Sequence, residues 1–152
     1  MQDTLCTAKT LYDLYYRRHG EYMDEMKMHK LMYFSQREAL MTRDEPLFDG
    51  TFYGYKFGPV LKEVREMYQR EKPFADITGK IPAEDIWLLE EVEKRYGSLS
   101  SWKLSRLSHE EFSWKDARAG LRTGEEGYQP MSLDAIRVDA VREIVARKAA
   151  YV

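Results

Sequence analysis

The segment MDEMKMHKLMYFSQREALMTRD, residues 23–44, decides the fold because its spacing predicts a long helix with more than one apolar face. Asp24 is a suitable N-cap for this helix, which we expect to end at about Thr42. On a helical wheel, one face carries Met28, Leu31, Met32, Ser35 and Ala39, and a second carries Met26, Tyr33 and Leu40. A helix with so wide an apolar surface is typical of the centre of a helical bundle.

Polar positions of this helix lie between the two apolar faces, and they are Lys27, Lys30, Gln36, Arg37 and Glu38. Lys27 and Lys30 therefore sit close to buried surface, where an ammonium group must reach water or find acceptors. We favour solvated lysines over a specific buried network.

Apolar periodicity and caps predict further helices on both sides of the central one. The first covers residues 4–18 and is closed by Gly20, another covers residues 83–96 after Pro82, and the last follows the N-cap Ser132. We therefore predict a mainly α protein, a compact single-domain bundle of about six helices with one small β-strand pair or hairpin.

Two short helices are expected between residues 100 and 119. Ser100 or Ser101 caps the first, which runs over Trp102, Leu104 and Leu107. Ser108, with Glu111 three residues later, predicts a capping box for the second.

The stretch FYGYKFGPVLKEV, residues 52–64, predicts a single aromatic strand followed by a helix. Tyr53, Tyr55 and Phe57 alternate with smaller or charged residues, which is typical of a strand. Gly58 ends this alternation, and Pro59 suits the first position of a helix over residues 60–68.

Two interpretations of this strand remain open. In one, residues 77–81 or the segment GYQP, residues 127–130, pairs with it and its aromatic side chains fill the core. In the other, it is an edge strand whose unpaired backbone groups join a partner chain. The second interpretation makes Tyr53, Tyr55, Lys56 and Phe57 candidate partner-binding residues, and adds Trp87, which lies near the polar side of its helix as a rim residue or a contact.

Composition favours a globular protein of the cytoplasm. The chain has 152 residues, 43% of them hydrophobic and 33% charged, with a net charge of −2 that disfavours binding to nucleic acid. One cysteine, Cys6, suits a reducing compartment, and no apolar run is long enough for a membrane span.

The sequence offers no recognisable catalytic constellation. Its histidines are His19, His29 and His109, and none of them belongs to an HExxH zinc motif. The segment GYKFGP lacks the pattern of a phosphate-binding loop, and Cys6 lies among apolar residues of a helix. We expect neither enzymatic activity nor a metal or cofactor.

Three segments together resemble the Panacea antitoxin domain, also called SocA-like or phage-associated GepA-like. They are KMHKLMYFSQ (residues 27–36), PLFDGTFYGYKFGPV (residues 46–60) and LSHEEFSWKDARAG (residues 107–120). The resemblance extends from about Asp24 to Ile136, and residues 1–22 are covered less closely. His29 replaces a common glutamine, Gly54-Tyr55 a common alanine-tryptophan, and Ser108 a common threonine. Within these segments we take as structural motif residues Lys30, Tyr33, Gln36, Gly58, Pro59, His109 and Trp114.

The resemblance implies that residues 1–152 form a single antitoxin domain. Such a domain neutralises a toxin encoded beside it by binding the toxin, in bacteria or phages, and has a mainly helical fold with a small β element. It also implies a non-enzymatic protein whose toxin the sequence does not identify, and self-association is left open.

Two alternative functions accompany this interpretation. In the first, residues 100–119 form a helix-turn-helix that binds DNA and regulates the protein's own operon. Its phosphate contacts would come from Lys103, Arg106, Lys115 and Arg118, although acidic residues lie among them. The end KAAYV, residues 148–152, suggests an adaptor that delivers the toxin to a protease.

Overall fold

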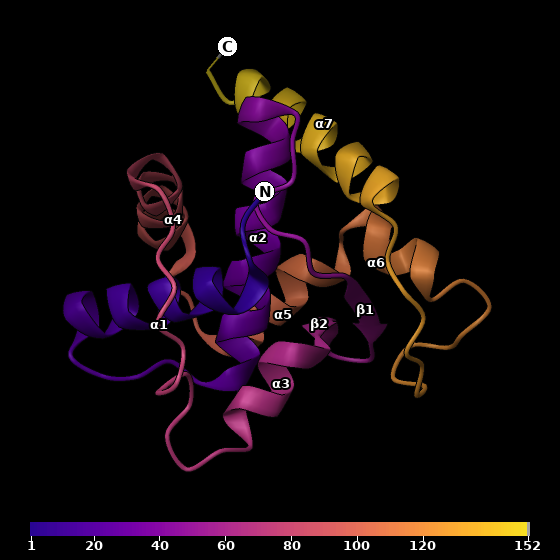
Figure 1. Ribbon diagram of the computed structural model, residues 1–152. Helices are drawn as coiled ribbons and strands as arrows, with labels where there is room; N and C mark the ends of the chain where they lie inside the picture. Colours follow the sequence, from indigo (N-terminus) through magenta and orange to yellow (C-terminus); the bar gives the residue numbers. More distant parts are fainter. Residues whose placement is uncertain (152) are drawn as a thin grey trace.

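The structure is a computed structural model that describes residues 1–151 (Figure 1). The described residues form seven helices and one two-stranded sheet, which confirms the mainly α prediction with one small strand pair. In chain order they are α1 (Thr4–His19), α2 (Glu25–Arg43), β1 (Phe52–Tyr55), β2 (Gly58–Leu61), α3 (Lys62–Tyr68), α4 (Ala83–Tyr96), α5 (Ser101–His109), α6 (Phe112–Ala117) and α7 (Leu133–Ala149).

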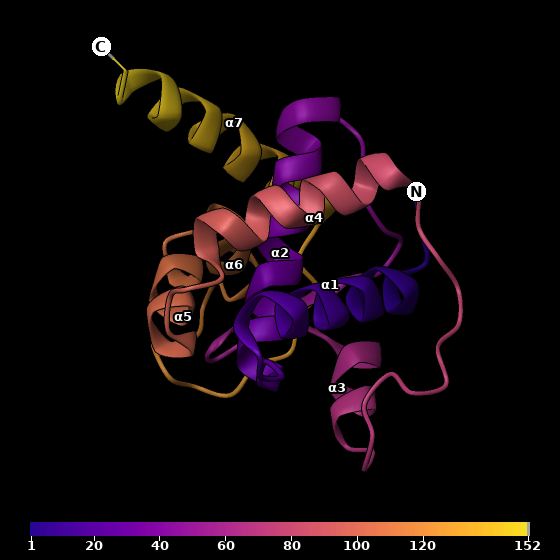
Figure 2. The same ribbon diagram turned by 90° about the vertical axis from the view of Figure 1, so that its left-hand side faces the viewer.

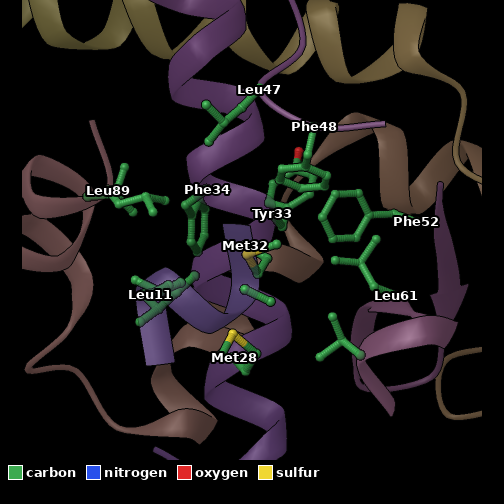
Figure 3. Close-up of a cluster of buried hydrophobic side chains, with 14 of the residues drawn as sticks. Leu11, Met28, Met32, Tyr33, Phe34, Leu47, Phe48, Phe52, Leu61 and Leu89 are labelled. Atoms are coloured by element: carbon green, nitrogen blue, oxygen red, sulfur yellow. The ribbon is translucent and has the colours of Figure 1, made fainter. Parts of the chain in front are cut away.

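Helix α2 is the central element, as its two apolar faces predict. It runs through the middle of the molecule, with α1 and α4 on one side and the hairpin, α6 and α7 on the other (Figures 1 and 2). Asp24 caps it by accepting a hydrogen bond from the Lys27 N–H at 2.7 Å. Met28, Met32 and Phe34 project from α2 into the apolar core shown in Figure 3.

The aromatic strand is paired within its own chain by the residues that directly follow it. β1 and β2 are antiparallel, with Phe52 opposite Leu61 and Tyr55 opposite Gly58. The prediction of a helix starting at Pro59 was therefore wrong, and α3 begins only at Lys62. Gly58 has a φ of 123°, so its positive dihedral serves the tight turn of a hairpin.

The other edge of β1 is also paired. The Gly54 N–H donates to the carbonyl of Gln129 at 2.8 Å, and the Met131 N–H donates to the carbonyl of Phe52 at 2.8 Å. The pairing predicted for GYQP is thus confirmed, whereas residues 77–81 form no strand. Because both edges are occupied, β1 is not the edge strand of the second interpretation.

The N-terminus of α6 is capped by a residue distant in sequence. Ser108 lies inside α5 and donates to the carbonyl of Ser105, so the predicted capping box was wrong. Asp139 of α7 instead accepts hydrogen bonds from the N–H groups of Phe112 (2.7 Å) and Ser113 (3.0 Å). The same carboxylate accepts the Tyr33 hydroxyl at 2.7 Å, which joins α2, α6 and α7 in the core.

Candidate partner-binding surface

The predicted partner-binding residues separate into three places. Tyr55, Lys56 and Phe57 lie together at the tip of the hairpin. Tyr53 lies elsewhere on β1, with the Lys62 ammonium 4.0 Å from the centre of its ring. Trp87 is on α4, across α2 from the hairpin in Figure 1, and is 62% exposed.

The tip of the hairpin contacts an exposed tryptophan that was not among the predicted partner-binding residues. Trp102 of α5 is 61% exposed, and its ring contacts that of Phe57 edge to face, with 5.4 Å between centroids. Phe57 is itself 44% exposed. The signal for Trp102 was available, because it lies about 200° around the helix from the buried Leu104. We define the hairpin surface as Tyr55, Lys56, Phe57, Trp102 and Tyr128.

Several motif residues hold the hairpin in place. The Trp114 indole N–H donates to the carbonyl of Tyr55 at 2.8 Å, and the His109 ring stacks on Trp114 with 4.2 Å between centroids. The buried Arg118 guanidinium donates to the carbonyl of Gly54 at 2.9 Å. These bonds fix the backbone that presents Phe57.

The buried position of Arg118 also bears on the helix-turn-helix interpretation. Its guanidinium contacts the carbonyls of Gly54 and Glu125, so it is not available to a phosphate. Helix α6 has only six residues, and its N-terminal N–H groups are taken by Asp139. Arg118 and the N-terminal N–H groups of α6 are therefore not available to DNA, which weakens this interpretation.

Gln36 fixes the loop that leads into the hairpin. Its side-chain oxygen accepts the Leu47 N–H at 2.7 Å, and its amide nitrogen donates to the carbonyl of Phe48 at 3.1 Å. A buried amide that is satisfied by backbone groups stabilises a single loop conformation.

Side chains of α2 cover the outer edge of β2. The Leu61 N–H donates to His29 Nδ1 at 3.2 Å, and His29 Nε2 lies 2.9 Å from the Glu25 carboxylate. Pro59 has no N–H to satisfy, which suits the outer edge of a strand. Its carbonyl faces Lys30 Nζ at 3.5 Å.

Lys30 is buried, so the favoured prediction of solvated lysines was wrong for it. Its side chain is 1% exposed, and the Pro59 carbonyl is its one acceptor within residues 1–151, at a distance longer than an ordinary hydrogen bond. Burial lowers the pKa of Lys30 to about 7, while Glu25 and Asp24 act in the opposite direction. An ammonium group in this position is costly to the fold.

Replacing Lys30 by methionine should stabilise the protein, most strongly at low pH. Between a folded pKa of about 7 and an unfolded value of 10.5, the unfolded chain binds the extra proton, so stability rises with pH. Below pH 7 both states are protonated, and the full cost of burying the charge is present. We expect Lys30→Met to raise the free energy of unfolding by about 2 kcal/mol at pH 6, and by less at pH 9. Urea denaturation measures both values, and a destabilised variant at pH 6 would contradict this description of Lys30.

Lys30 forms part of a cavity of about 280 Å³ beneath the tip of the hairpin, which we call the hairpin pocket. The rings of Tyr55 and Tyr128 meet at its wall, with 4.8 Å between centroids. At its mouth, Lys56 Nζ pairs with one oxygen of Glu126 at 2.7 Å. The Tyr128 hydroxyl donates to the other oxygen at 2.7 Å.

A larger groove of about 660 Å³ lies between α2, α4 and α7, and Trp87 is part of its lining. Arg147 crosses it to Glu38, with two nitrogen–oxygen contacts of 2.9 Å. Trp87 thus belongs to a surface separate from the hairpin surface.

The described part of the chain has neither a cluster of metal ligands nor a membrane-spanning helix. Residues 1–151 contain no group of three or more histidine, cysteine or acidic side chains placed to hold a metal ion. None of their helices combines the length and the apolar character required to cross a membrane.

One protein-family model matches a large part of the chain. The family model described as antitoxin SocA-like, Panacea domain, matches residues 28–115, which include the hairpin, α3, α4, α5 and most of α2 and α6. No curated protein and no solved structure matches the chain. Because the matched residues make up more than half of the sequence, the chain belongs to the SocA-like, Panacea-domain antitoxin family.

Proposed function

We propose that this protein is an antitoxin that neutralises a toxin by direct contact through the hairpin surface. The observation that carries the proposal is the pair formed by Phe57 and Trp102, two large aromatic side chains that are exposed and in contact. Exposed aromatic groups of this kind are enriched at the energetic centres of protein interfaces.

The rigidity of the hairpin supports the same proposal. Trp114 and Arg118 hold its carbonyls, and both edges of β1 are paired. A surface that is ordered before binding loses little conformational entropy when a partner arrives, which raises affinity. The mode of binding is therefore docking of side chains rather than addition of a strand to β1.

Coexpression with the toxin encoded beside this protein tests the proposal. We expect the double variant Phe57→Ala/Trp102→Ala to lose protection, because truncating a buried aromatic anchor typically costs about 2 kcal/mol or more of binding energy. Both side chains are exposed in the free protein, so the variant should retain its helical circular dichroism and its level of soluble expression.

Trp87→Ala is the matched control, because Trp87 and Trp102 are almost equally exposed but lie on different surfaces. We expect Trp87→Ala to protect as the wild type does. Protection that survives the double variant and fails in Trp87→Ala would place the interface in the groove between α4 and α7 instead. The amount of toxin in protected cells should stay constant, whereas an adaptor for a protease would lower it.

A further inference from the structure

We infer that the hairpin pocket receives an acidic side chain of the bound toxin, whose carboxylate takes the place of Glu126 and contacts Lys56 and Lys30. This inference rests on the proposed function, since it names the chemistry that the partner presents to the hairpin surface. It adds a polar anchor beside the aromatic pair of Phe57 and Trp102.

The charges of the hairpin pocket favour an anion. Three basic side chains take part in its lining, the cationic Lys56 and Arg65 and the partly protonated Lys30, against the single carboxylate of Glu126. Arg65 also approaches Glu25 at 3.4 Å, outside the pocket lining. A cationic cavity with low-dielectric walls attracts negatively charged groups.

Lys30 lacks adequate acceptors in the free protein. An ammonium group has three donors, yet within the described residues Lys30 faces one carbonyl at 3.5 Å. Buried donors are normally paired, because an unmade hydrogen bond inside a protein is costly. A carboxylate in the hairpin pocket would supply the missing acceptor and would favour the charged form of Lys30.

Glu126 already occupies the mouth of the pocket as an internal carboxylate. Its two oxygens are held by Lys56 and by the Tyr128 hydroxyl, so these two groups are arranged to bind a carboxylate. The Glu126 side chain is nevertheless 57% exposed, and an ion pair this exposed contributes little stability. A carboxylate of the toxin can therefore displace Glu126 at small cost.

The size and position of the pocket favour a side chain of a protein partner. About 280 Å³ is small for a cofactor or a drug-sized ligand. Phe57 belongs both to the wall of the pocket and to the aromatic pair, so a protein that covers Phe57 and Trp102 also closes the pocket. Tyr55 and Tyr128 would then exclude water from the ion pair, which strengthens it.

Calorimetric titration of the purified toxin into this protein and its variants tests the inference. We expect Lys56→Gln and Lys30→Met each to weaken binding about tenfold or more, because each removes a contact to the carboxylate. Glu126→Gln should tighten binding about threefold, because it removes the internal competitor while it keeps the shape of the side chain. Lys103→Gln, a change of an exposed lysine on α5 next to Trp102, is the charge control and should bind as the wild type does.

The dependence of affinity on pH gives a second readout. The carboxylate favours protonated Lys30, so wild-type affinity should fall as the pH rises from 6 to 9, and Lys30→Met should remove that fall. The charged and titratable groups around Lys30 are Glu25 and His29 of α2, its N-cap Asp24, Lys56, Arg65 and Glu126 of the pocket, and His109 of α5. The difference between the two proteins isolates Lys30, because the other groups are present in both.

Different results would contradict the hairpin pocket and the hairpin surface. Unchanged affinity in Lys30→Met, Lys56→Gln and Glu126→Gln, together with weak binding by Phe57→Ala/Trp102→Ala, would overturn the pocket and leave the hairpin surface standing. Unchanged affinity in the double aromatic variant would overturn the hairpin surface itself.

Discussion

The Asp139→Ala variant is expected to lose about 3 kcal/mol of unfolding free energy. Asp139 is 1% exposed, and its carboxylate accepts from the N–H groups of Phe112 and Ser113 and from the hydroxyl of Tyr33. Alanine would leave two buried donors and the half-buried Phe112 N–H without this acceptor and would remove the cap of α6, and each such loss costs about 1–3 kcal/mol. Urea denaturation followed by tryptophan fluorescence measures the change.

One opposing effect keeps the expected loss of unfolding free energy at the lower end of this range. Burial raises the pKa of Glu111 to about 8, with Asp139 adding to the rise, while the contact with Arg37 acts against it. Removing Asp139 lowers the pKa of Glu111 and so favours the charged form that pairs with Arg37, which returns part of the lost stability.

Asp134→Ala provides the control on the same helix. The Asp134 side chain is 95% exposed, and its contact with Arg137 is 3.4 Å long. We expect a change within about 0.5 kcal/mol for this variant, as is usual for exposed ion pairs. Equal effects of the two substitutions would show that Asp139 does not join α2, α6 and α7 as described.

The Gly58→Ala variant should lose about 3 kcal/mol or more of unfolding free energy. Gly58 has a φ of 123°, which side-chain-bearing residues rarely adopt. A Cβ atom there would lie 2.6 Å from Ser108 Oγ and 2.7 Å from Lys30 Cε, and both neighbours are buried. The strain of the backbone and the overlap with buried atoms therefore add together. Thermal unfolding and urea denaturation both report the loss.

Gly120→Ala separates these two causes. Gly120 also has a positive φ, 87°, but no atom would lie within 4 Å of an added Cβ. The Gly120→Ala variant should lose only about 1 kcal/mol of unfolding free energy, because it introduces backbone strain without any overlap of atoms. If Gly58→Ala lost no more than Gly120→Ala, the close packing of the hairpin on Lys30 and Ser108 would be refuted.

The long helices could be predicted from the sequence because their signals are local. Asp24, Gly20 and Ser132 cap helices that show clear apolar periodicity, and the structure confirms all three caps. The cap of α6 could not be predicted, because Asp139 lies 26 residues beyond Ser113 and no pattern of sequence links them.

The segment GPVL, residues 58–61, shows why the second strand of the pair was not located from the sequence. Proline and glycine suit both the start of a helix and a hairpin, so local preference does not separate the two. Pairing with β1 and the bond from the Leu61 N–H to His29 decide for the strand. These are tertiary contacts, and they override the local signal.

Only some residues of the hairpin surface could be predicted from the sequence. The alternation of aromatic residues identified Tyr55 and Phe57, whose exposure differs from that of the buried Phe52. Trp102 joins them across 45 residues of chain, so only the folded structure shows the pair. The same holds for the hairpin pocket, where Lys30 and Glu126 come from distant segments.

Calorimetric titration of the purified toxin into the wild-type protein and into Phe57→Ala/Trp102→Ala tests most directly whether neutralisation is direct binding at the hairpin surface. We predict a saturable complex with the wild type and affinity at least about 100-fold weaker for the double variant. We predict wild-type affinity for Trp87→Ala. Absence of binding between the purified proteins, in a pair for which coexpression gives protection, would contradict neutralisation by contact.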